Sequence, residues 1–181
     1  MRRNERLLTS ARTAGRNFRS MGSIRGASRH RQITVDIGLG RGEVVFQSCV
    51  QRLMSWEMHR AAGINVLGES AGVRMNAVVI LRPRLPLPPV SAPCKVELVW
   101  ARDTTAGFRY ATLEGHPERG RETFVVARRP DGEVTFHIRA TSMPSWRMPR
   151  LAVWIVDRIQ DMVTRNYLHV MREAGMRVGG A

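Results

Sequence analysis

The stretch GFRYATLEGHPERGRETF, residues 107–124, decides the fold because it reads as two alternating strands joined by a tight loop. Side chains two residues apart in a strand share one face of the sheet. If Phe108 and Phe124 both point to the core, three polar residues point there as well: Tyr110, Thr112 and Glu122. The loop contains the residue types that tight loops require: Gly115, Pro117 and Gly120.

The same stretch carries the candidate functional residues. His116 and Glu118 lie in the loop, at the end of the sheet where the inward polar side chains gather. A pocket with apolar walls and a few convergent polar groups is the usual form of a ligand site. The candidate ligand-binding residues are therefore Tyr110, Thr112, His116, Glu118 and Glu122. A single His beside two carboxylates is more often a hydrogen-bonded loop anchor than a catalyst, so we favour a structural or ligand-orienting role.

The elements before this stretch follow from the hydrophobic period. Residues 33–37 alternate and predict a first strand, and residues 38–42 predict a turn. A 3.6-residue period predicts a helix over residues 43–62, ended by Gly63. Glu57 falls in the middle of the apolar face of this helix. Either it has a partner or faces a wet cavity, or the helix frays or bends before Glu57 and leaves it exposed.

The remaining elements complete an α+β pattern. Strands are expected over residues 72–81, 94–102, 108–113, 121–128 and 133–141, with an extended Pro-rich loop over 83–93. A long amphipathic helix is expected from Pro149 to Gly175, with Gln160 and Thr164 on its polar side. Short connections predict an antiparallel sheet curved around this C-terminal helix. That is the helix-grip arrangement of the START and Bet v 1-like superfamily, although ordinary α+β sandwiches share the same order of elements.

The length and the charge limit the organisation of the chain. Its 181 residues suit one domain, and the net charge is +14. Residues 1–31 hold nine Arg and one Glu, so most of the excess charge lies there. This composition predicts a disordered basic tail; the alternatives are a translation start at Met21 and an arm for nucleic acid or acidic membrane. The expected domain covers residues 32–176, and residues 177–181 are expected to be a flexible C-terminus.

Composition excludes several classes of protein. No apolar run approaches the roughly 18 residues of a membrane-spanning helix. Outside the tail, no stripe of basic and aromatic residues predicts a nucleic-acid surface. Cys49 and Cys94 have no metal-ligand spacing, and we expect buried thiols in a reducing compartment, hence a cytoplasmic location. His59 and His169 are expected to face solvent, and His137 the opposite face of its strand.

Two functions fit these residues. The first is a binding protein for a small apolar or amphipathic ligand, held in a cavity between the sheet and the C-terminal helix. The alternative is an enzyme of unknown reaction, in which His116 moves a proton together with Glu118 or Glu122. No nucleophile elbow, phosphate loop or metal-ligand cluster is present, so neither a cofactor nor a metal is expected.

The chain also resembles a family without an assigned activity, the bacterial and plant uncharacterised protein family 0548. The resemblance spans residues 38–174 and rests mainly on the family pattern GF-x-YGTL-x-GHP-x-x-GEE-x-F. The matching residues are Gly107, Phe108, Tyr110, Thr112, Leu113, Gly115, His116, Pro117, Gly120, Glu122 and Phe124. Ala111 and Arg121 depart from the pattern, where the family has Gly and Glu. Arg121 is expected to point outward, so that Glu122 keeps the inward carboxylate. The resemblance implies a fold but no substrate.

Overall fold

A computed structural model describes residues 2–15, 31–68, 72–85, 90–144 and 150–179. In chain order, its elements are α1 (Arg2–Thr13), β1 (Arg31–Arg41), α2 (Glu43–Met54), α3 (Glu57–Ala61), β2 (Ile64–Gly68), β3 (Val78–Pro83), β4 (Ala92–Arg102), β5 (Thr105–Thr112), β6 (Glu118–Arg128), β7 (Glu133–Pro144) and α4 (Arg150–Gly179). None of the helices in these residues is long and apolar enough to cross a membrane.

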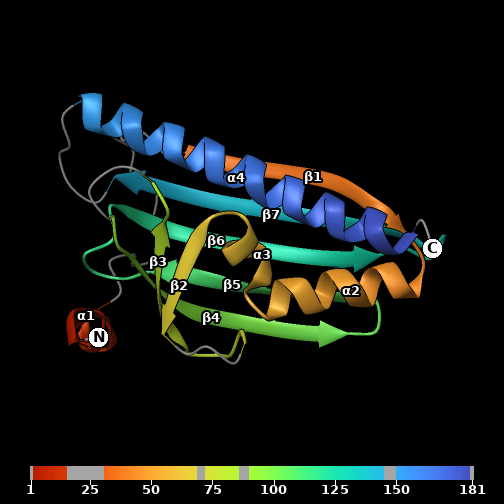
Figure 1. Ribbon diagram of the computed structural model, residues 1–181, viewed down its shortest axis with the longest axis horizontal. Coiled ribbons are helices and arrows are strands. Elements are labelled where there is room, and N and C mark those ends of the chain that lie inside the picture. The colour runs from red at the N-terminus through yellow and green to blue at the C-terminus, as the bar shows by residue number, and fades with distance from the viewer. Residues whose placement is uncertain (1, 16–30, 69–71, 86–89, 145–149, 180–181) are drawn as a thin grey trace, which may run out of the picture.

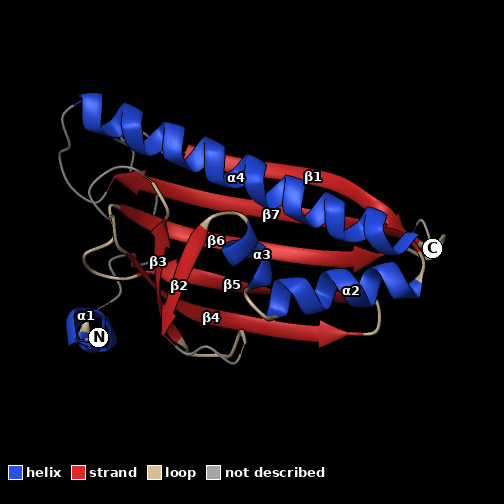
Figure 2. Ribbon diagram, in the orientation of Figure 1, coloured by secondary structure: helices blue, strands red, loops and turns tan. Residues whose placement is uncertain are grey.

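The strands form one antiparallel sheet in the order β1-β7-β6-β5-β4-β3-β2. Helices α2, α3 and α4 lie on the same face of this sheet, and α4 runs along β1 and β7 (Figures 1 and 2). The expected α+β fold, an antiparallel sheet curved around a long C-terminal helix in the helix-grip arrangement, is confirmed. The core lies between these helices and the face of the sheet that they cover, because an amphipathic helix buries a single apolar stripe.

The strand faces follow the predicted alternation. Phe108 and Phe124 lie opposite each other in the register of β5 and β6, and both are fully buried. Their rings pack 5.2 Å apart, centroid to centroid. Burying a large aromatic side chain is worth about 2–3 kcal/mol. This pair therefore fixes which face of β5 and β6 points to the helices, and with it the direction of the polar side chains on the same face.

The helix predicted over residues 43–62 is divided in two. Helix α2 ends at Met54, and Trp56 adopts a left-handed backbone with φ 63° before α3 begins. The change of direction leaves the Glu57 side chain 57% exposed, so the helix bends before Glu57 as one alternative held. It also turns His59 inward, where this side chain has no exposed surface. The expectation that His59 faces solvent was wrong.

Four further differences concern the sheet and the last helix. Residues 38–42 do not form the predicted turn, because β1 continues to Arg41 through a bulge between Gly38 and Gly40. Strand β2 was not predicted, and β3 begins at Val78 rather than at residue 72. Gly175 does not end α4, which reaches Gly179. A Cβ at Gly175 would lie 1.9 Å from the carbonyl oxygen of Leu39, so this glycine permits close packing of α4 on β1.

The basic N-terminal segment is partly ordered. Residues 2–13 form α1, whose buried Ala11 packs with Ile80 and Leu113. The prediction of disorder was therefore wrong for this part, because a few apolar residues on one helix face suffice for docking. Arg31 belongs to β1. Residues 1, 16–30 and 180–181 lie outside the described residues. Helix α4 includes residues 177–179 of the expected flexible C-terminus.

Candidate functional site

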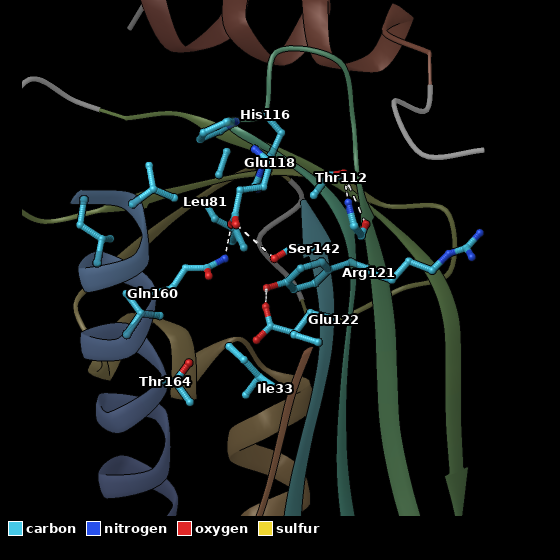
Figure 3. A pocket seen from close by; sticks show the side chains of 18 of the residues that line it. Ile33, Leu81, Thr112, His116, Glu118, Arg121, Glu122, Ser142, Gln160 and Thr164 are labelled. Atoms are coloured by element: carbon cyan, nitrogen blue, oxygen red, sulfur yellow. Dashed lines mark hydrogen bonds between the residues drawn. The ribbon is translucent and has the colours of Figure 1, made fainter. Parts of the chain in front are cut away.

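A cavity of about 140 Å³ lies between α4 and one end of the sheet. It is formed where β5 ends and β6 begins, with β1 and β7 beside them and α4, at the left of Figure 3, across from the strands. The wall formed by β1 and α4 is largely apolar: Ile33, Val156, Ile159 and Val163. All five candidate residues from the sequence line this one cavity: Tyr110, Thr112, His116, Glu118 and Glu122. The sequence thus predicted their convergence, while their role in binding remains a proposal.

Tyr110 and Glu122 form the inner polar pair. They lie directly opposite each other in the register of β5 and β6, and the Tyr110 hydroxyl donates a hydrogen bond to Glu122 Oε2. Burial raises the pKa of Glu122 to about 7; the bond from Tyr110 opposes this, and the charge of Glu118 adds to it. Burial also raises the pKa of Tyr110, which therefore stays protonated and keeps donating.

Glu118 is the second carboxyl group and lies at the start of β6. Ser142 Oγ donates to its Oε1 over 3.1 Å, and Gln160 Nε2 donates to its Oε2. Burial raises the pKa of Glu118 to about 7, although the bonds from Ser142 and Gln160 and the charge of Arg31 pull it down. Two carboxyl groups of one cavity therefore change charge near neutral pH.

His116 and Thr112 hold the loop that closes this end of the cavity. The backbone N–H of Glu118 donates to His116 Nδ1 over 2.9 Å, which places the ring proton on Nε2. Burial lowers the pKa of His116 to about 4, so the ring is neutral at pH 7. Thr112 Oγ1 accepts a bond from the N–H of Gly120 over 2.9 Å. Thr112 therefore fastens β5 to β6 besides lining the cavity.

Arg121 points away from the cavity, as expected (Figure 3). Its Nε lies 2.9 Å from Glu97 Oε2, on the other face of the sheet. The difference from the family pattern at this position thus leaves the inward carboxyl group of Glu122 in place. His137 also lies on that other face, where it pairs with Asp36, and His169 is exposed on α4.

Several lining residues were missed in the sequence. Ser142 and Gln160 hold Glu118, and Thr164 and Tyr167 extend the wall along α4. Gln160 was assigned to the polar side of α4, yet it stands four residues after Val156 and three before Val163, on the same stripe. This spacing in the sequence was the signal that Gln160 lies on the side of α4 that faces the sheet.

Behind the cavity lies a fully buried histidine in an aromatic cluster. The His59 ring lies 4.9 Å from the rings of Trp56 and Tyr167 and 6.4 Å from that of Tyr110. Neither of its ring nitrogens, nor Trp56 Nε1, has a hydrogen-bond partner among the described residues. Burial lowers the pKa of His59 to about 3, so this ring is neutral as well. Among all the described residues, no group of three or more His, Cys, Asp or Glu side chains is placed to hold a metal ion.

Solved structures resemble this fold at low sequence identity. The hypothetical protein jhp0584 from Helicobacter pylori aligns with a TM-score of 0.57 at 11% identity, covering 87% of this chain and 99% of that one. An uncharacterized protein from Rhizobium leguminosarum aligns with a TM-score of 0.53 at 11% identity, covering 83% and 97%. At such identity the likeness shows the fold alone.

Sequence comparison places the chain in a family. No curated protein matches it. The pattern of a domain of unknown function, DUF1990, matches residues 20–170, which include β1 and every residue singled out in the cavity. The expectation of an uncharacterised family is thereby confirmed. The chain belongs to the DUF1990 family of domains of unknown function.

Proposed function

We propose that this protein binds a small amphipathic molecule in the cavity between α4 and the sheet. The observation that carries the proposal is the division of the cavity lining. Apolar side chains from β1 and α4 form one wall, and the polar groups of Tyr110, His116, Glu118 and Glu122 gather at the loop end. Such a division orients a ligand with one apolar and one polar end.

The volume limits the size of the ligand. An engineered apolar cavity of about 150 Å³ accommodates one benzene molecule. The cavity here, about 140 Å³, therefore encloses a group of the size of a six-membered ring. A longer ligand would leave its remaining atoms outside the cavity.

We assign different roles to the polar residues. Glu122 and Tyr110 form the inner contact for the polar end of the ligand, because they come from the middle of the sheet. Glu118 and His116 form an outer contact at the loop, and Thr112 holds the loop in place.

Both cysteines are free and buried, which supports the predicted cytoplasmic location, where thiols stay reduced.

A cavity-filling variant tests the proposal. Ala140 lines the cavity beside Glu122 in the register of β7, so Ala140→Leu removes space without adding charge. Ala101→Leu, at an exposed position of β4, is the matched control. Titration with benzyl alcohol, followed by protein-detected NMR, should shift signals of cavity residues in the wild type and the control but not in Ala140→Leu. Equal binding by all three proteins would contradict the proposal.

An enzyme using acid–base chemistry is the second candidate. The observation in its favour is that burial raises the pKa of both Glu118 and Glu122 to about 7, a range in which a carboxyl group accepts and releases protons. Its test is incubation with small ketones in deuterated water. Proton loss from the carbon beside the carbonyl group, abolished in Glu122→Gln, is the expected result. Equal exchange with and without the protein would refute this candidate.

A further inference from the structure

The charge around Glu122 distinguishes between classes of ligand. Among the described residues, the charged group that acts on this carboxyl is another acid, Glu118. The Arg121 guanidinium, although its residue borders the cavity, is bonded to Glu97 on the other face of the sheet. Arg31 binds Asp157 and Asp161 of α4. Although the net charge of the chain is +14, the inner carboxyl group of Glu122 has no basic partner among the described residues.

Gln160 supplies a second acceptor, and this one has no donor among the described residues. Gln160 Oε1 is buried and has no hydrogen-bond partner among the described residues, while its Nε2 is occupied by Glu118. An unsatisfied buried acceptor costs about 1–3 kcal/mol. Gln160 lines the same cavity and extends into it from α4 (Figure 3). The cavity therefore offers acceptors at two places, Glu122 on the sheet and Gln160 on the helix.

We infer that the bound molecule carries a protonated amine, whose N–H groups donate to Glu122 and Gln160 while its apolar body lies against β1 and α4. This inference rests on the proposed binding function and names the ligand class for it. An ammonium group has three donors and no acceptor, which complements a site rich in acceptors. Tyr110 and Tyr167 also line the cavity, and the face of an aromatic ring attracts a cation. An anionic ligand would meet Glu122 and Glu118, of which the outer one, Glu118, also feels the charge of Arg31.

The affinity for the amine should rise with pH. Burial keeps Glu122 partly protonated near pH 7, and an ammonium ion binds its ionised form. The titratable groups that act on Glu122 from the packed elements are Cys94 of β4, Tyr110 of β5, Glu118 of β6 and Tyr167 of α4. Burial raises the pKa of the Cys and of both Tyr residues, so the two carboxyl groups are the ones that ionise between pH 6 and pH 8.

Three probes of one size test the inference: benzylamine, benzyl alcohol and benzoate, which are cationic, neutral and anionic. At pH 8, we expect the wild type to bind benzylamine about tenfold more tightly than benzyl alcohol, since a charged hydrogen bond is worth more than a neutral one. Benzoate should bind most weakly. Glu122→Gln should remove the preference for the amine over benzyl alcohol. Glu173→Gln, a change at a half-buried position of α4 that does not line the cavity, controls for the loss of one negative charge.

The outcomes separate the two proposals. Benzyl alcohol or benzoate bound as tightly as benzylamine would overturn the amine inference and leave the binding function supported. Failure of all three probes to bind would overturn both proposals. The comparison of probes on the unaltered protein decides the inference even if Glu122→Gln is unstable. In that variant, a retained preference for benzylamine would show that another group holds the cation.

Discussion

Replacing His59 with leucine should stabilise the protein, although it alters a fully buried residue of the core. The His59 ring lies among Trp56, Phe124 and Tyr167, with centroid distances of 4.9, 5.3 and 4.9 Å. Its two nitrogens have no hydrogen-bond partner among the described residues. Leucine has a similar volume and no polar atom, so His59→Leu removes the unsatisfied nitrogens and leaves the packing nearly filled.

The magnitude follows from two opposing contributions at pH 7. An unsatisfied buried polar group costs about 1–3 kcal/mol, and the aromatic contacts of the lost ring are worth about 0.5–1.5 kcal/mol. The free energy of unfolding should therefore rise by about 1 kcal/mol. A larger effect appears in acid. Burial lowers the pKa of His59 from 6.5 to about 3, so below pH 6.5 the unfolded chain binds a proton that the native chain refuses.

This linkage makes the advantage of the variant depend on pH with a definite sign. Stability of the wild type is lost as the pH falls from about 6.5 toward 3, and His59→Leu is spared that loss. Between pH 7 and pH 5 the gap between the two proteins should widen by about 2 kcal/mol. Contributions of Glu118, Glu122 and His116 are common to both proteins and cancel in the difference.

Urea unfolding at several pH values between 5 and 8, followed by tryptophan fluorescence or circular dichroism, measures this gap. His169→Leu is the control, because it replaces an exposed histidine of α4 and leaves the buried His59 in place. Parallel curves for the wild type and His59→Leu would refute the reasoning. Such a result would mean that His59 is protonated or hydrogen-bonded in the native protein.

Three further changes test other parts of the structure. Because burial raises the pKa of Glu122 from 4.5 to about 7, wild-type stability falls as the pH rises through this window. In urea unfolding, the free energy of unfolding of Glu122→Gln relative to that of the wild type should therefore rise by about 3 kcal/mol between pH 4.5 and pH 7. A difference that stays constant with pH would contradict this prediction. A Cβ at Gly120 would lie 2.0 Å from a carbonyl oxygen of β7, so Gly120→Ala should destabilise the protein by about 1–3 kcal/mol. Thermal melting checks this, with Gly15→Ala, whose Cβ meets no atom of the described residues within 4 Å, as the neutral control; an unchanged Tm for Gly120→Ala would be the contrary result. Burial raises the pKa of Cys49 to about 11 and also that of Cys94, so a maleimide dye should label neither in the native protein and both in urea, as read by mass spectrometry. Labelling before unfolding would show that a thiol is accessible.

The core face of the sheet was predictable because its signal is local. A strand alternates its side chains whatever it packs against, so Phe108 and Phe124 determine the direction of Tyr110 and Glu122 once both rings are assigned to the core. The loop glycines likewise made a tight connection readable, and with it the position of His116. The same stretch carries the main block of the family resemblance, although the family match extends over residues 20–170.

The surroundings of the candidate site required the tertiary structure. No local pattern shows that Gln160 of α4 reaches Glu118 across the cavity, because the crossing of helix and sheet brings together residues 42 positions apart. The left-handed backbone of Trp56 was equally unreadable, since a tryptophan there is strained and the burial of its ring, which stabilises it, depends on the whole fold. That one residue breaks the predicted helix and moves His59 from the surface into the core.

By itself, the sequence determined the helix-grip order of elements, the inward residues of β5 and β6, and the loop that carries His116. The tertiary structure alone decided which groups those residues meet. It brought two carboxyl groups, a neutral imidazole and an unsatisfied amide oxygen around one cavity. The physical reason is that alternation acts between neighbours in the chain, whereas burial, which raises the pKa of Glu118 and Glu122, depends on every element that excludes water from the cavity.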